Sequence, residues 1–202
     1  MRILFLTILT VSTLKSYGQN GYVKFDNDSI LVGYLRYYVS IMDGHQGIEL
    51  WRTKKDKEPL KIPKRSVNEY SIKKDTFKVL HQFKPFHDTQ TYFELVDAKL
   101  KSSGKVNLYI IENYQNTNRI STYTVGGLIP AIIDESLGNY TYIYILEDKE
   151  TGLLKALPSK KEKLKESLII FFPEKYILKY DQVKGKINYK SIPDLVKLYN
   201  SK

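Results

Sequence analysis

Residues 21–39 read GYVKFDNDSILVGYLRYYV and have the pattern of a β-hairpin. Two runs rich in apolar and aromatic residues, Gly21 to Phe25 and Ile30 to Val39, flank the turn sequence Asp26-Asn27-Asp28-Ser29. Such side chains favour turns because they hydrogen-bond to their own backbone. In the second run both alternating sets of positions are apolar, which predicts a central strand covered on both faces. Gly33 in that run predicts either a bulge or a close approach of another backbone.

The same rhythm of short apolar runs and turn residues continues along the chain as far as residue 157. Further strands are expected at residues 48–53, 60–62, 69–72, 77–83, 92–100, 106–112, 140–146 and 153–157. The sequence therefore predicts an α+β fold whose N-terminal part is an antiparallel β-sheet or partly open β-roll. It should have about eight or nine short strands.

From Pro158 onward the spacing of apolar residues changes from two to nearly four, which predicts two or three C-terminal helices covering the sheet. The first has a capping-box sequence at Ser159 to Glu162. Its apolar stripe comprises Leu164, Leu168, Phe171 and Phe172. A second helix is expected at residues 174–183, with Gly185 as a left-handed cap, and a third at residues 191–199.

The first 18 residues have the pattern of a signal peptide. Arg2 supplies the positive charge, and Ile3 to Leu14 is an uncharged apolar run that is too short to span a bilayer. Ser16-Tyr17-Gly18 has the small residues of a cleavage site, so cleavage after Gly18 would make Gln19 the new N-terminus. The alternative is that residues 3–14 form a buried strand or helix.

One domain is expected after the signal peptide. Removing 18 residues from 202 leaves 184, which is enough for one hydrophobic core and short for two. We expect a single α+β domain over residues 19–202, with a β-rich part at 19–157 and a helical part at 158–202. The chain has no cysteine, so burial rather than disulfides must stabilise it, and a lipoprotein is excluded by the lack of a cysteine near the cut. We expect export to the periplasm or the cell surface.

Positive charge is concentrated in the last quarter of the chain. The formal net charge of +10 would fall to +8 on loss of Arg2 and Lys15 with the signal peptide. Residues 19–148 hold 17 basic and 16 acidic side chains, whereas residues 149–202 hold 13 lysines and 6 acids. The candidate contacts for a polyanion are Lys160, Lys161, Lys163 and Lys165. The alternative is a set of solvated lysines, and the absence of arginine from this quarter makes nucleic acid an unfavourable partner.

No catalytic, metal-ligand or cofactor signature stands out in the sequence. His81 and His87 lie six apart beside Asp88, but His81 shares its predicted strand face with apolar residues, which indicates a core histidine. Ser136 lacks the glycine two residues before it that a nucleophile elbow needs. We therefore assign no catalytic residue, metal or cofactor, and lean toward a function other than catalysis.

Two segments are candidates for binding. Tyr140, Tyr142 and Tyr144 alternate along one predicted strand, so they share a face that could stack on sugar rings or form a packed inner face. The run from Val125 to Leu137 predicts a short apolar helix that could contact a membrane or partner, or pack as ordinary core. Its candidate contact residues are Val125, Leu128, Ile129, Ile132 and Ile133.

Several short motifs resemble those of a known group of proteins. They are Gly21-Tyr22, Asp28-Ser29-Ile30, Gly33-Tyr34, Gly104 to Tyr109, and the ending Ile192 to Asn200, together with the Gly18-Gln19 cleavage site. In these motifs the chain resembles exported proteins of unknown function that are common in Bacteroidota. The resemblance implies a periplasmic or cell-surface location and carries no catalytic residues.

The leading hypothesis from the sequence is an exported, non-enzymatic envelope protein that binds a partner or ligand, such as an envelope protein, a glycan or a membrane surface. One alternative is a secreted hydrolase whose site is assembled only in the fold. A second alternative is polyanion binding through the lysine-rich C-terminal helices.

Overall fold

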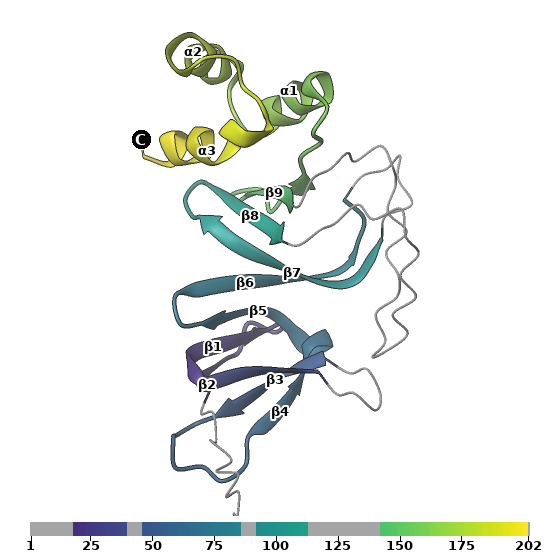
Figure 1. Cartoon of the computed structure of the whole chain (residues 1–202), viewed down its shortest axis with the longest axis vertical. Helices are drawn as coiled ribbons and strands as arrows, with labels where there is room; N and C mark the ends of the chain where they lie inside the picture. The colour runs from purple at the N-terminus through teal and green to yellow at the C-terminus, as the bar shows by residue number, and fades with distance from the viewer. Residues whose placement is uncertain (1–17, 40–45, 86–91, 113–141, 202) are drawn as a thin grey trace, which may run out of the picture.

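A computed structural model describes residues 18–39, 46–85, 92–112 and 142–201. Within this part of the chain, ten strands form one antiparallel sheet, and three α-helices follow at the C-terminal end (Figure 1). The strands are β1 (Gln19–Phe25), β2 (Ile30–Val39), β3 (Gln46–Trp51), β4 (Leu60–Pro63), β5 (Val67–Ile72), β6 (Asp75–Phe83), β7 (Phe93–Ser102), β8 (Val106–Glu112), β9 (Tyr142–Asp148) and β10 (Leu154–Ala156). The α+β class is confirmed, and the predicted count of eight or nine strands was too low.

The sheet consists of two meanders that meet in its middle. The strand order is β10-β9-β8-β7-β6-β5-β1-β2-β3-β4, and β4 and β10 are short edge strands of 4 and 3 residues. After β4, a 3-10 turn at Lys64–Ser66 leads the chain into β5, which pairs with β1. This return places the β5–β6 turn close to the start of β1, where Lys73 N donates to the Asn20 carbonyl oxygen at 2.9 Å.

The predicted first hairpin is present, and its turn is held by Asn27. The Asn27 side-chain oxygen accepts from the backbone N–H and the hydroxyl of Ser29, at 3.1 Å and 2.6 Å. Gly33 lies opposite Gly21 in a regular register, so it forms no bulge. A Cβ at Gly33 would lie 2.3 Å from the Trp51 carbonyl oxygen, so the close backbone approach is confirmed.

Strand β2 is central, but only one of its faces is covered. Leu35 is 1% exposed and packs in a core with Val23, Ile48 and Leu50. On the opposite face Val32 is 72% exposed. The prediction that both faces are covered was wrong, because the three helices lie over a different part of the sheet.

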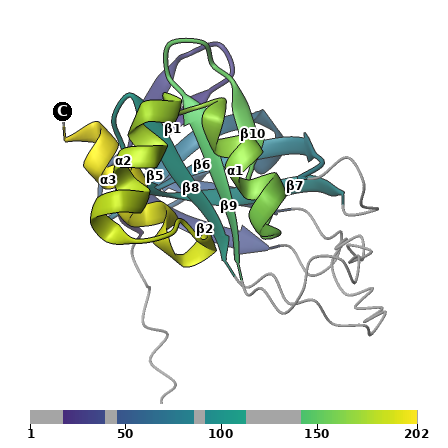
Figure 2. The ribbon, with the colours of Figure 1, turned by 90° about the horizontal axis from the view of Figure 1, so that it is seen from above.

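The helices are α1 (Lys161–Ile169), α2 (Glu174–Lys184) and α3 (Ile192–Asn200), and they gather at one end of the long axis (Figures 1 and 2). Their core shares side chains with β8 and β9, among them Leu108 and Leu146. The predicted stripe is confirmed, since Leu164, Leu168, Phe171 and Phe172 are all buried.

The helix ends differ from those that the sequence predicted. Residue Lys160 is the N-cap of α1 and no side chain caps that helix, so the predicted capping box at Ser159 to Glu162 does not form. The capping box of this region instead joins Asn188 and Ser191, just before α3. Gly185 ends α2 with a positive φ of 92°, although its ψ of 172° is not that of a left-handed helix.

Candidate functional site

An open hollow of about 650 Å³ lies where the start of β1 meets the β5–β6 turn and β2. Its lining residues are Gly18, Gln19, Asn20, Tyr34, Lys54, Lys73, Lys74 and Asp75. These residues come from four separate segments, and the sheet topology brings them together because β5 pairs with β1.

The hollow is basic. Lys54, Lys73 and Lys74 are exposed, and none of them forms an ion pair with a described residue. Asp75 is the carboxylate among the lining residues, and it is engaged by Lys99 at 2.9 Å. Three lysine charges therefore line the hollow, and few nearby acidic groups are available to neutralise them.

The aromatic wall of the hollow is Tyr34, a half-buried residue of β2. The Lys54 ammonium lies 5.3 Å from the centroid of the Tyr34 ring, within the range of a cation–π contact. This contact holds a charge from the β3–β4 connection at the wall of the hollow. The hollow thus combines an aromatic ring and cationic groups with the polar residues Gln19 and Asn20.

Lys73 has an unusual backbone, with a φ of 59° in the two-residue turn between β5 and β6. A left-handed conformation is disfavoured for residues with a Cβ and is normally adopted by glycine or asparagine. The turn therefore presents a lysine at a position where the backbone alone would favour glycine.

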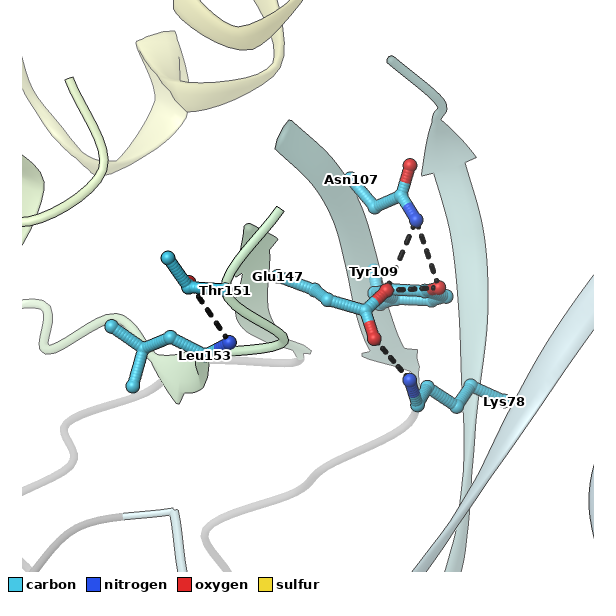
Figure 3. Close-up of polar contacts among 6 residues, drawn as sticks. All are labelled: Lys78, Asn107, Tyr109, Glu147, Thr151 and Leu153. Carbon is cyan, nitrogen blue, oxygen red and sulfur yellow. Dashed lines mark hydrogen bonds and ion pairs between the residues drawn. The ribbon is translucent and has the colours of Figure 1, made fainter. Parts of the chain in front are cut away.

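A second polar cluster lies on the sheet and links β6, β8 and β9 (Figure 3). The Glu147 carboxylate accepts from Lys78 with one oxygen. With the other it accepts from the Tyr109 hydroxyl at 2.8 Å and the Asn107 amide at 3.0 Å. Burial raises the pKa of Glu147, but the hydrogen bonds from Lys78, Tyr109 and Asn107 outweigh it and leave the pKa below its usual value.

The composition of β7 allows this cluster to form. Lys78 on β6 pairs across the sheet with Ala98 on β7, and Ala98 is fully buried. We infer that a small side chain at this position leaves room for Lys78 to reach the β8 and β9 cluster. Both Glu147 oxygens are hydrogen-bonded, so the cluster stabilises the sheet and offers no free group for chemistry. Figure 3 also shows the β9–β10 turn, where Leu153 N donates to the Thr151 hydroxyl at 3.3 Å.

A third polar cluster surrounds Lys64, whose side chain is only 3% exposed. Lys64 donates to Asp97 at 2.6 Å, and its ammonium lies 5.2 Å from the Tyr37 ring centroid. Burial, and then the Asp97 charge, raise the pKa of Tyr37 to about 12. Burial followed by Asp97 also raises the pKa of Tyr70. The ion pair gives this buried lysine a partner beside the apolar core of β1 to β6.

Two of the three tyrosines that the sequence placed on one face, Tyr142 and Tyr144, pack in the core that the helices share with β8 and β9. Tyr144 is buried and its ring centroid is 4.9 Å from that of Tyr189, while Tyr142 is half-buried and 5.9 Å from Tyr189. Stacking of an external ligand on Tyr144 is therefore not supported, and the packed inner face describes these two residues. Tyr140 and the predicted contacts Val125, Leu128, Ile129, Ile132 and Ile133 lie outside the described residues.

The lysines proposed for polyanion binding lie at the start of α1. Lys160, Lys161 and Lys163 are exposed, whereas Lys165 is half-buried and pairs with Asp181 at 3.2 Å. Lys165 is therefore partly neutralised by the protein itself.

The hydrolase alternative gains no support from the described residues. His81 is exposed and its Nε2 lies 3.2 Å from the Val67 carbonyl oxygen, so the prediction of a core histidine was wrong. No group of three His, Cys, Asp or Glu side chains is placed to hold a metal ion in the described part of the chain. None of the described helices is long and apolar enough to cross a membrane.

Sequence reasoning missed the hollow, although one of its parts was visible. Residues 54–58 are recognisable as a charged turn, and Lys73-Lys74 follows a predicted strand. Their proximity depends on the β1–β5 pairing, which joins segments almost 50 residues apart, as the 49-residue separation of the Tyr22–Ser71 hydrogen bond shows. No family model, curated protein or solved structure matches this chain.

Proposed function

We propose that this chain is an exported, non-enzymatic envelope protein that binds an acidic saccharide in the hollow between β1, β2 and the β5–β6 turn. The observation that carries the proposal is the set of three lysines that line the hollow, Lys54, Lys73 and Lys74, none of which forms an ion pair with a described residue. The periplasm or the cell surface is the proposed location, on the basis of the signal-peptide pattern at residues 1–18.

The chemistry of the lining favours a saccharide that carries carboxylate, sulfate or phosphate groups. Tyrosine offers an apolar ring and a hydroxyl, which suits the mixed surface of a sugar. Asn20 lies opposite Tyr34 in the β1–β2 register, so its amide shares a face with the Tyr34 side chain and can donate to and accept from sugar hydroxyls. A neutral sugar offers no anionic group to the three ammonium groups, whereas an acidic sugar would accept charge-assisted hydrogen bonds from them.

Cleavage after Gly18 would strengthen this arrangement. Cleavage would remove Gly18 from the lining, and the mature chain would begin at the wall of the hollow with Gln19 and Asn20. A free α-amino group at Gln19 would add positive charge there, whereas cyclisation to pyroglutamate would not.

A binding role suits the hollow better than hydrolysis. Glycoside hydrolysis generally needs two carboxyl groups flanking the bond that is cleaved. The carboxylate among the lining residues is Asp75, and Lys99 engages it. We therefore propose that the ligand is held and not cleaved.

Isothermal titration calorimetry of the mature protein with a sulfated, heparin-derived disaccharide tests the proposal. The variant to compare is Lys54→Gln/Lys73→Gly/Lys74→Gln. Glycine at position 73 suits the positive φ of 59°, so this change should not weaken the hairpin. Three lost charge-assisted contacts should lower the affinity by at least about tenfold, since tenfold corresponds to only about 1.4 kcal/mol.

The matched control is Lys61→Gln/Lys105→Gln/Lys149→Gln, which removes three exposed lysines outside the hollow. It should bind like the parent protein, and a neutral disaccharide should bind more weakly than the sulfated one. Equal losses in the two triple variants, or equal affinity for the two disaccharides, would show that the hollow is not a site for acidic saccharides.

A further inference from the structure

The outward surface of α2 exposes large aliphatic side chains. Leu178 is 54% exposed and Val183 is 67% exposed, although both lie in a helix whose other side is buried through Ile177 and Tyr180. Two further aliphatic residues, Ile169 and Ile170, are 51% and 49% exposed where α1 ends. Four of the exposed large hydrophobic residues in the described chain thus fall within residues 169–183.

Lysines flank these aliphatic residues. Lys175 and Lys179 lie three residues before and one residue after Leu178, which by helical spacing places all three on the outward side of α2. Lys184 follows Val183 as the last residue of the helix, and Lys186 lies two residues further on. All four lysines are exposed, and we call Leu178, Val183 and these four lysines the α2 surface.

The acids near the α2 surface neutralise little of its charge. Asp181 is turned inward, where it pairs with Lys165 at 3.2 Å and accepts from Ile187 N at 2.7 Å. Burial raises the pKa of Asp181, but the hydrogen bonds from Ile187 and Lys165 outweigh it and leave the pKa below its usual value. Glu174, in the first turn, is the exposed acid of α2.

From this pattern we infer that the α2 surface docks on an anionic lipid bilayer. Basic residues next to exposed aliphatic residues on a helix are what interfacial binding requires: the aliphatic groups enter the headgroup region and the lysines meet anionic lipid. A soluble polyanion would pair with the lysines but would leave Leu178 and Val183 exposed to water. The combination therefore favours a bilayer over a polysaccharide or nucleic acid.

The position of the helices fits this role. They occupy one end of the long axis, whereas β3 and β4 lie at the other end (Figure 1). The hollow belongs to β1, β2 and the β5–β6 turn, several strands away from the β8 and β9 strands under the helices. Docking through α2 would leave the hollow free, and this inference does not depend on what the hollow binds.

Co-sedimentation of the mature protein with vesicles tests the inference. We expect binding to phosphatidylcholine vesicles that contain about 30 mol% phosphatidylglycerol, and little binding to pure phosphatidylcholine. Lys175→Glu/Lys179→Glu and Leu178→Ser/Val183→Ser should each weaken the binding by about tenfold or more. Circular dichroism confirms that each variant is folded, and the two variants change different chemistry, so failure of one to fold leaves the other.

Matched controls lie on the sheet and in its β3–β4 connection. Lys55→Glu/Lys61→Glu reverses two exposed charges, and Ile30→Ser/Val32→Ser removes two residues that are 55% and 72% exposed. Both should bind vesicles like the parent protein. The inference fails if the parent protein does not sediment with anionic vesicles, or if the controls lose as much binding as the α2 variants. It also fails if only the charge variant loses binding, because the surface would then recognise polyanions and not a bilayer.

Discussion

Replacing Glu147 with glutamine should destabilise the sheet by about 2 to 3 kcal/mol. The carboxylate is 13% exposed and Lys78 is 24% exposed, so the change leaves a largely buried ammonium without its counter-charge. Removing one partner of a fully buried ion pair costs about 3 to 5 kcal/mol, and partial exposure of Lys78 reduces this figure. Glutamine keeps the shape of the side chain, and it can still accept from Tyr109 and Asn107, so little of the loss comes from packing.

The exposed pair Lys101–Glu112 on β7 and β8 provides the control, with side chains that are 37% and 47% exposed. Glu112→Gln makes the same chemical change and should cost no more than about 1 kcal/mol. The double variant Lys78→Met/Glu147→Gln should recover part of the stability lost in Glu147→Gln, because no buried charge is then left alone.

The effect should depend on pH in a defined direction. The pKa of Glu147 is lower in the folded protein than its unfolded value of about 4.3. Its stabilising contribution is therefore complete well above pH 4.3 and is lost as the pH falls through the folded pKa. Urea denaturation at pH 7 and at lower pH should show the gap between parent and Glu147→Gln shrinking in acid. Equal losses for Glu147→Gln and Glu112→Gln at pH 7, or a gap that grows in acid, would refute this reasoning.

Three further predictions concern the fold. Gly33→Ala should cost about 1 to 3 kcal/mol in thermal or urea unfolding, because its Cβ would lie 2.3 Å from the Trp51 carbonyl oxygen; a neutral effect would contradict the close approach. Asn188→Ala should lower the free energy of unfolding by about 1 kcal/mol because the Asn188 cap is lost, while Ser159→Ala should be nearly neutral. A larger loss for Ser159→Ala than for Asn188→Ala would instead support the predicted capping box at Ser159 to Glu162. Burial raises the pKa of Tyr22, Tyr37 and Tyr144 to about 12. Since unfolded tyrosine ionises near pH 10, their contribution is complete below pH 10 and falls as the pH rises toward 12. Absorbance at 295 nm should therefore show a class of tyrosines that ionises near pH 12, and a single transition near pH 10 would exclude it.

The strands and helices were predictable because their signals are local. Turn residues such as Asp26 to Ser29 and the helical stripe from Leu164 to Phe172 act through neighbours in sequence, and both were placed correctly. All ten strands overlap a segment predicted from the sequence, including the short β4 and β10, so the expected count of eight or nine was lower than the number of predicted segments. The prediction that both faces of β2 are covered was wrong because the helices cover β8 and β9, and no local pattern in β2 indicates where the helices pack.

The hollow could not be predicted because it depends on a long-range strand pairing. Lys54, Lys73 and Tyr34 lie in separate turns and strands of the sequence, and they meet only because β5 returns to pair with β1. Conversely, the alternating Tyr142 and Tyr144 are a correct local signal for a shared face, but the face is the one that packs on Tyr189. Periodicity identifies a shared face, whereas exposure depends on the packing of the whole sheet.

The most direct test of the proposed function is an NMR titration of the isotope-labelled mature protein with the sulfated disaccharide. The account predicts saturable shifts for the amides of Asn20, Tyr34, Lys54 and Lys73, and none of comparable size for residues 160–165. Shifts confined to residues 160–165 would move the binding to the lysines of α1, and the hollow would then not be the ligand site.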